Sequence, residues 1–142
     1  MCIYAVGRMD ANKNHEMLLR AFSGLAADFP LVRLVIYGNG ECREPLRELA
    51  EQMNLSDRVS LPGAVTDVAD KIYKGSAFVL SSFSEGMPNT LIEAMCLGLP
   101  VISTDCPCGG PAELIQDGIN GLLIPPGDTA ALELALRTLL SD

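Results

Sequence analysis

The sequence predicts a doubly wound α/β fold: a mostly parallel, Rossmann-like sheet with helices on both faces. Two observations support this prediction. Short apolar runs, several of them ending in glycine, alternate with longer segments whose apolar residues recur at helical spacing. Because crossovers between parallel strands return right-handed across the sheet, this alternation places helices on both of its faces.

The expected elements follow one another without a repeat or a low-complexity linker. They are a strand at 2–6, a helix at 13–28, a strand at 32–37, a helix around 46–53, a strand at 59–61 that ends at Pro62-Gly63, a strand at 77–81, a helix at 90–97, and strands at 101–104 and 122–124. A closing helix runs to Leu140, with Asp128 in position to cap it.

Composition indicates a single soluble domain. The chain has 142 residues and is 49% hydrophobic, which is enough to bury one core. No apolar run reaches the roughly 20 residues that span a bilayer, and the start does not resemble a secretion signal. We therefore expect a cytoplasmic protein.

Charge and cysteine content exclude several classes of function. Ten Lys and Arg against eighteen Asp and Glu give a net charge of −8, which would repel nucleic acid and anionic membranes over most of the surface. Any anion site must therefore be local. Five cysteines without a C-x-x-C pair suggest neither a disulfide framework nor a zinc site.

Polar and glycine residues follow the predicted strands, at the edge where ligands of doubly wound sheets bind. These residues are Gly7, Arg8 and Lys13 after the first strand, Gly38-Asn39-Gly40 after the second, Gly63 after the third, residues 84–89 after the fourth and Asp105 after the fifth. All are expected along one edge.

Arg8 and Lys13 flank a strand-to-helix turn in an acidic protein, which suits a pocket for phosphate oxygens. Ordinary surface charge remains the alternative for this pair. Gly7, which lets a ligand approach the backbone, favours the phosphate interpretation.

The segment from Glu85 to Glu93 combines features of a sugar-nucleotide site. Pro88 and Asn89 mark a helix start, whose free N–H groups favour phosphate, and Gly86 permits close approach of the backbone. Carboxylates beside phosphates are suited to bind sugar hydroxyls, and Glu93 shares a helix face with Asn89. The alternative makes Glu93 a helix-stabilising acid and Glu85 a solvated loop residue.

Three further features carry weaker signals. Gly38-Asn39-Gly40 resembles part of a dinucleotide fingerprint, but Arg43 occupies the third glycine position, so a tight turn is favoured and nucleotide contact stays open. His15 has no predicted carboxylate or serine partner and is interpreted as a packing or capping residue. Cys106-Pro107-Cys108 has poor spacing for a metal and indicates a shaped loop before a short helix.

The order of these motifs resembles the C-terminal domain of retaining GT-B glycosyltransferases of family 4, the glycosyl transferases group 1. The resemblance covers nearly the whole chain. It rests on residues 84–95, on 98–102, on 118–122, and on the opening Gly7-Arg8 with Lys13-Asn14.

The resemblance implies a role for each matching residue. Arg8 and Lys13 match the pair that neutralises the donor diphosphate in place of a divalent metal, so no metal or other cofactor is expected. Glu85 and Glu93 match the acids of an E-x7-E motif, the first near the donor hexose and the second at the ribose. Catalysis is thus assigned to Glu85, Arg8 and Lys13.

The resemblance also implies backbone contacts to the donor. Residues 86–89 match a loop whose amides meet the sugar and phosphate, and residues 59–61 match a strand end beside the base. The donor-binding residues expected besides Glu93 are Gly7, Gly38, Val59, Ser60, Leu61, Gly86, Met87, Pro88, Asn89 and Thr90.

The implied protein is half of an enzyme. Residues 1–142 would bind a nucleotide sugar, with UDP-hexose or UDP-N-acetylhexosamine as first choice, for retaining hexosyl transfer in bacterial polysaccharide or glycoconjugate synthesis. The N-terminal acceptor domain and the final C-terminal helices would be missing, so the isolated domain is expected to be inactive. The full-length protein is compatible with attachment at the inner face of the membrane through its other domain.

Three alternatives share this architecture. A nucleotide-sugar 2-epimerase would need histidine and acids beyond those present, and a phosphorylase would need a lysine for pyridoxal phosphate. A receiver-like or nucleotide-sensing module would need an acidic cluster where this chain has Arg8.

Overall fold

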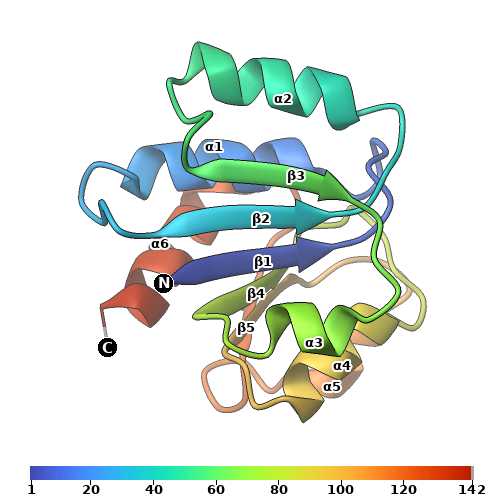
Figure 1. Cartoon of the computed structure of the whole chain (residues 1–142). Helices are drawn as coiled ribbons and strands as arrows, with labels where there is room; N and C mark the ends of the chain where they lie inside the picture. The colour runs from blue at the N-terminus through green and yellow to red at the C-terminus, as the bar shows by residue number, and fades with distance from the viewer. Residues whose placement is uncertain (142) are drawn as a thin grey trace.

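A parallel sheet forms the middle layer of this computed structural model, which describes residues 1–141 (Figure 1). Asp142, the last residue of the predicted domain, lies outside the described residues. The six strands are β1 (Cys2–Val6), β2 (Arg33–Tyr37), β3 (Val59–Gly63), β4 (Ala77–Leu80), β5 (Val101–Thr104) and β6 (Leu122–Ile124). They lie in the order β3-β2-β1-β4-β5-β6, and every neighbouring pair is parallel.

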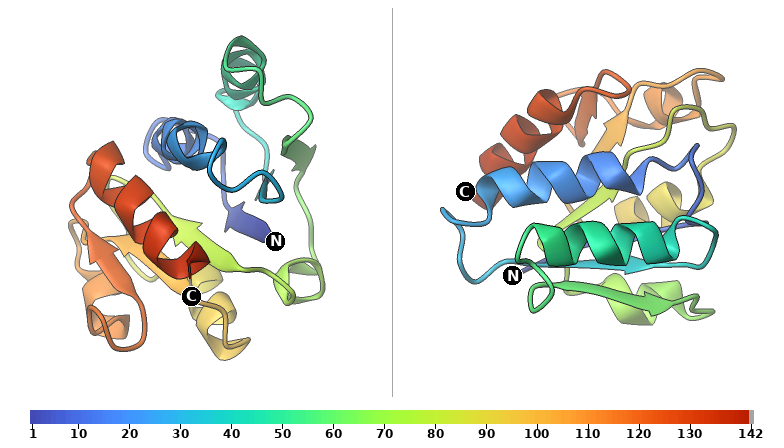
Figure 2. Two further views of the ribbon diagram at one scale, coloured as in Figure 1. Left: turned by 90° about the vertical axis from the view of Figure 1, so that its left-hand side faces the viewer. Right: turned by 90° about the horizontal axis from the view of Figure 1, so that it is seen from above.

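Helices cover both faces of the sheet, as predicted (Figure 2). They are α1 (His15–Leu25), α2 (Arg43–Gln52), α3 (Val68–Ile72), α4 (Asn89–Cys96), α5 (Gly110–Leu114) and α6 (Thr129–Leu140). Helices α1, α2 and α6 lie on one face, and α3, α4 and α5 lie on the other. The doubly wound Rossmann-like fold is therefore confirmed.

Alternation along the strands divides the core into two clusters. Ile3 and Ala5 of β1 are buried in the cluster beneath α1 and α6, whereas Tyr4 and Val6 pack against the cluster beneath α3 and α4. Successive side chains of a strand point to opposite faces, so one strand serves both clusters.

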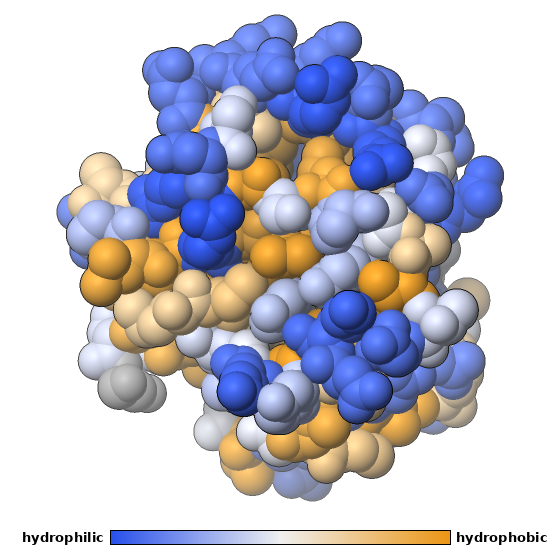
Figure 3. Space-filling model, in the orientation of Figure 1, coloured by the Kyte–Doolittle hydropathy of each residue, from blue (hydrophilic) through white to orange (hydrophobic). Residues whose placement is uncertain are grey.

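The outward face of α2 is hydrophilic, as Figure 3 shows at the top of the molecule.

Several predicted bounds are confirmed and others need correction. The strands at 2–6, 101–104 and 122–124 match, and Asp128 caps α6 by accepting a hydrogen bond from the Ala131 N–H at 2.9 Å. The predicted helix at 13–28 is shorter: it begins at His15, because Asn14 has a left-handed conformation with φ of 49°, and it ends at Leu25. Helix α3 was not predicted, since its five residues are too few to show a helical period.

The third strand is longer than the predicted 59–61, because it includes Pro62 and Gly63, which were predicted to end it. It runs to Gly63 because β3 is an edge strand, where the missing N–H of Pro62 leaves no ladder partner unsatisfied.

Among residues 1–141 no helix combines the length and hydropathy that crossing a bilayer requires.

The loops after β4 and β5 touch through their backbones. A Cβ added to Gly110 would overlap the carbonyl oxygen of Gly86, and the Glu85 N–H donates to the Pro107 carbonyl at 3.2 Å. Gly110 therefore keeps the segment that begins at Glu85 close to the first turn of α5.

We predict that Gly110→Ala destabilises the protein by about 1–3 kcal/mol, because the added methyl group forces these loops apart. Urea denaturation monitored by circular dichroism measures the change. Gly86→Ala is the matched control, since a Cβ there meets nothing within 4 Å. Equal stability of the two variants would contradict the prediction.

His15 is buried at the start of α1, in agreement with a packing role. The residue is 5% exposed, and among the described residues its Nδ1 is a buried atom without a hydrogen-bond partner. Burial, reinforced by the positive charge of Lys13, lowers the pKa of His15 from 6.5 to about 4. The imidazole is therefore neutral in the folded protein at pH 7.

Stability is predicted to fall as the pH falls from about 7 to 5. In this window the unfolded chain protonates its single histidine and the folded chain does not, so the unfolded state binds more protons. The loss is about 2 kcal/mol over this range. Urea titrations of the parent and of His15→Gln test it: the parent should show the slope and the variant should lack it, whatever its absolute stability.

Candidate functional site

The strand order reverses between β1 and β4, and the loops that follow these two strands lie against each other. The Asn12 side chain donates to the Ser84 carbonyl at 3.0 Å and accepts from the Ser84 N–H at 3.1 Å. The Phe83 N–H donates to the Asn12 carbonyl at 2.8 Å. Doubly wound sheets bind ligands at such a reversal, so this loop pair is the candidate site.

Lys13 and Glu85 meet here, although 72 positions separate them in the sequence. Lys13 Nζ lies 2.5 Å from Glu85 Oε2, and the two side chains are only 23% and 11% exposed. The backbone of Lys13 is held at both ends: its N–H donates to Asp10 Oδ1 at 3.0 Å, and its carbonyl accepts from Ser81 Oγ at 2.9 Å. The ammonium is therefore fixed at the strand reversal.

Ser82 completes the arrangement, although it was not among the predicted site residues. Its hydroxyl donates to the same Glu85 Oε2 at 2.6 Å, and its carbonyl accepts from Thr104 Oγ1 at 2.6 Å. Ser82 stands three residues before Glu85, just past a strand. Serine side chains often form hydrogen bonds with groups this close in sequence, so this spacing could have indicated the contact.

The two oxygens of Glu85 consequently differ. Oε2 has two donors, whereas Oε1 accepts no hydrogen bond from residues 1–141. The Glu85 side chain as a whole is 11% exposed. This oxygen can accept hydrogen bonds from a ligand without disturbing the contacts to Lys13 and Ser82.

Arg8 lies apart from this ion pair. Its side chain is 68% exposed, 3.7 Å from Asp10 and 3.6 Å from Glu41. Exposed pairs of this kind contribute little, so the guanidinium is free to turn toward a ligand. It borders a cavity of about 340 Å³ at the carboxyl ends of β1 and β2, together with Val6, Gly7, Tyr37, Gly38, Asn39, Ala64 and Val65.

Gly7 and Gly38 thus lie together on the predicted edge, and the hydrogen-bonded turn before α2 runs from Gly40 to Arg43. Gly38 has φ of +144°, and a Cβ there would overlap the Gly7 carbonyl oxygen. Arg43, which interrupts the glycine fingerprint, donates to the Leu61 carbonyl at 2.7 Å and joins α2 to the edge strand. The glycines therefore serve close packing of the two loops.

Residues 59–61, which were predicted beside the base, do not line this cavity. Val59 and Leu61 instead line a separate cavity of about 200 Å³ between α2 and β3. Since the strand continues to Gly63, the residues that reach the cavity beside Gly7 are Ala64 and Val65, which the sequence analysis did not select.

Helix α4 begins at Asn89 with Pro88 at its N-cap, in agreement with the predicted helix start. Met87 is 62% exposed, Gly86 is also exposed, and Thr90 is half-buried. Glu93 is exposed, and no side chain among residues 1–141 forms a hydrogen bond or ion pair with it. The structure therefore joins Glu85 to Lys13 but leaves Glu93 and Arg8 as separate, solvent-facing groups.

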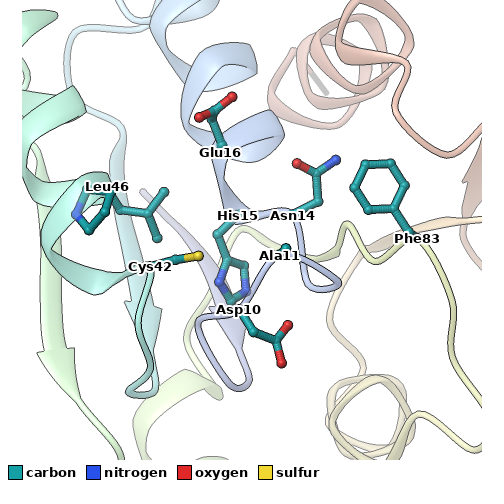
Figure 4. Close-up of a pocket in the computed structure, with 9 residues that line it drawn as sticks. Asp10, Ala11, Asn14, His15, Glu16, Cys42, Leu46 and Phe83 are labelled. Carbon is teal, nitrogen blue, oxygen red and sulfur yellow. The ribbon is translucent and has the colours of Figure 1, made fainter.

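A further cavity, of about 380 Å³, lies between the starts of α1 and α2 (Figure 4). Asp10, His15 and Cys42 line one part of it, and the exposed ring of Phe83 lies across from them. Asp10 and Glu16 make its polar lining acidic, which suits hydroxyl donors better than phosphate. No cluster of His, Cys, Asp and Glu suited to a metal occurs in the described chain.

Several curated relatives of the chain are named as glycosyltransferases. It is 34% identical over 140 residues to the N-acetylgalactosamine-N,N'-diacetylbacillosaminyl-diphospho-undecaprenol 4-alpha-N-acetylgalactosaminyltransferase of Campylobacter jejuni, covering 99% of the chain and 37% of that protein. It is 36% identical over 138 residues to the lipopolysaccharide 1,6-galactosyltransferase of Escherichia coli, covering 93% and 37%. The chain thus spans little more than a third of these relatives.

Solved structures of GT-B glycosyltransferases share the fold. A variant of S. aureus TarM, solved with UDP among its ligands, matches with a TM-score of 0.94 at 26% identity, covering 99% of this chain and 28% of that one. The pneumococcal O-GlcNAc transferase GtfA, in complex with UDP and GlcNAc, matches with a TM-score of 0.89 at 28% identity, covering 99% and 29%. The family model described as glycosyl transferases group 1 matches residues 2–142. The chain therefore belongs to the glycosyl transferases group 1 family.

Proposed function

We propose that the chain is the donor-binding domain of a retaining hexosyltransferase that uses a nucleoside diphosphate sugar. The observation that carries this proposal is the partly buried Lys13–Glu85 pair at the strand reversal. It supplies a cation for phosphate oxygens and, at Glu85 Oε1, an acceptor for sugar hydroxyls.

UDP-hexose or UDP-N-acetylhexosamine is the donor we propose first. Support comes from the UDP in the two similar structures and from the N-acetylgalactosaminyl and galactosyl transfer named for the relatives. The relatives' names also support a role in bacterial polysaccharide or glycoconjugate synthesis. We propose that Gly7, Gly38, Ala64 and Val65 border the nucleotide and that Glu93 binds the ribose.

The proposed chemistry is stabilisation of a leaving diphosphate. As the glycosidic bond breaks, negative charge grows on the phosphate oxygens, which Lys13, a reoriented Arg8 and the N–H groups at the start of α4 would stabilise. These interactions strengthen in the transition state and so lower its barrier. With two cations in this role, the transfer is proposed to need no metal, and acceptor binding is assigned to the remainder of the full-length protein.

Isothermal titration of the 142-residue chain with UDP, GDP and ADP tests donor binding. We expect weak but saturable binding of UDP, weakened about tenfold or more in Lys13→Met, since a charge-assisted contact of about 1.5 kcal/mol or more is lost. Lys71→Met, on the exposed face of α3, is the charge-matched control. Absence of nucleotide binding by both the chain and the full-length protein would refute the proposal.

Transfer by the full-length protein tests the chemistry. Lys13→Met should lower kcat by about a hundredfold, corresponding to roughly 3 kcal/mol of lost transition-state stabilisation, and chelation by EDTA should leave the rate unchanged. Proton NMR of the product should show the anomeric configuration of the donor. Epimerisation of the donor without any acceptor would point instead to an epimerase.

A further inference from the structure

Lys13 and Glu85 neutralise each other in the structure. Their contact is 2.5 Å long and largely shielded from water. A phosphate group that recruits the Lys13 ammonium must therefore compete with a carboxylate already bound to it. The affinity of this site for phosphate therefore depends on the free energy needed to separate Lys13 from Glu85.

Loss of the Lys13 contact is unfavourable for the Glu85 carboxylate. Once Lys13 turns to a phosphate, Ser82 remains as the one donor to Glu85 Oε2 that the described residues provide. With 11% of the side chain exposed, water compensates little of the lost charge interaction, and the arriving phosphates add repulsion. A bare nucleoside diphosphate therefore leaves an uncompensated carboxylate in the site.

A sugar on the diphosphate removes this penalty. Oε1 of Glu85 has no hydrogen-bond donor among residues 1–141, and sugar hydroxyls are donors that can supply it. Ser82, itself fixed through Thr104, holds Oε2 and so keeps Oε1 directed away from the buried contacts. Hydrogen bonds from the sugar hydroxyls to Glu85 then offset the loss of its ion pair with Lys13.

We propose that Glu85 is a specificity-determining residue that makes the site prefer a nucleoside diphosphate sugar to the bare nucleoside diphosphate, because it releases Lys13 at lower cost when sugar hydroxyls replace that cation. This inference rests on the proposed function and deepens it. Its consequence is that the nucleotide product binds more weakly than the donor and leaves the site readily.

Calorimetric titration of the chain with UDP, UDP-glucose and UDP-N-acetylglucosamine tests the preference. In Glu85→Gln, UDP should bind about fivefold tighter or more, because Lys13 no longer has a charged competitor. The ratio of the dissociation constants of UDP and the better-bound sugar nucleotide should fall by a similar factor. Glu113→Gln, an exposed acid on α5, removes the same charge away from Lys13 and should change neither value.

The double variant Lys13→Met/Glu85→Gln distinguishes competition for Lys13 from direct repulsion between Glu85 and the phosphates. If Glu85 acts through Lys13, the gain in UDP affinity from Glu85→Gln should fall below about twofold in the Lys13→Met background. A gain that persists in full there would overturn the exchange, as would UDP binding that Glu85→Gln leaves unchanged. If the parent and Glu85→Gln bind none of these nucleotides, the proposed function fails instead.

Discussion

The contact between the loops after β1 and β4 is the constraint on which the candidate site depends. At this point the sheet changes direction, so neighbouring strands come from distant parts of the sequence. Backbone and side-chain hydrogen bonds between Asn12 and Ser84 hold the loops together, and the Lys13–Glu85 pair closes the contact. A cation from one loop thereby becomes the partner of an acid from the other.

Buried hydroxyls give this pair its fixed geometry. Ser81, Ser82 and Thr104 are all nearly inaccessible to solvent, and each donates a hydrogen bond to the site or to the strand beside it. Because both donors to Glu85 reach the same carboxylate oxygen, the other oxygen is left for a ligand. Polar networks of this kind are stable inside a protein when their members are paired.

The candidate site also divides into rigid and adaptable parts. Lys13 and Glu85 are shielded and mutually paired, whereas Arg8 and Glu93 face solvent without a strong partner. This division suits a domain that must hold a diphosphate at one place and close around a nucleotide and a sugar at others. Family membership agrees with such a role, and the donor, the acceptor and the retaining mechanism stay proposals.

The sequence by itself determined the alternation of strands and helices, because burial on two faces imposes periods of 2 and 3.6 that are visible in a single chain. It also indicated Arg8, Lys13, Glu85 and Glu93, through their positions near the ends of predicted strands and through motifs that resemble a known family. The tertiary structure alone decided that Lys13 pairs with Glu85, that Ser82 supports them, and that Ala64 and Val65 replace residues 59–61 at the cavity. These relations follow from strand order and from where an edge strand ends, which long-range packing determines and local periodicity does not encode.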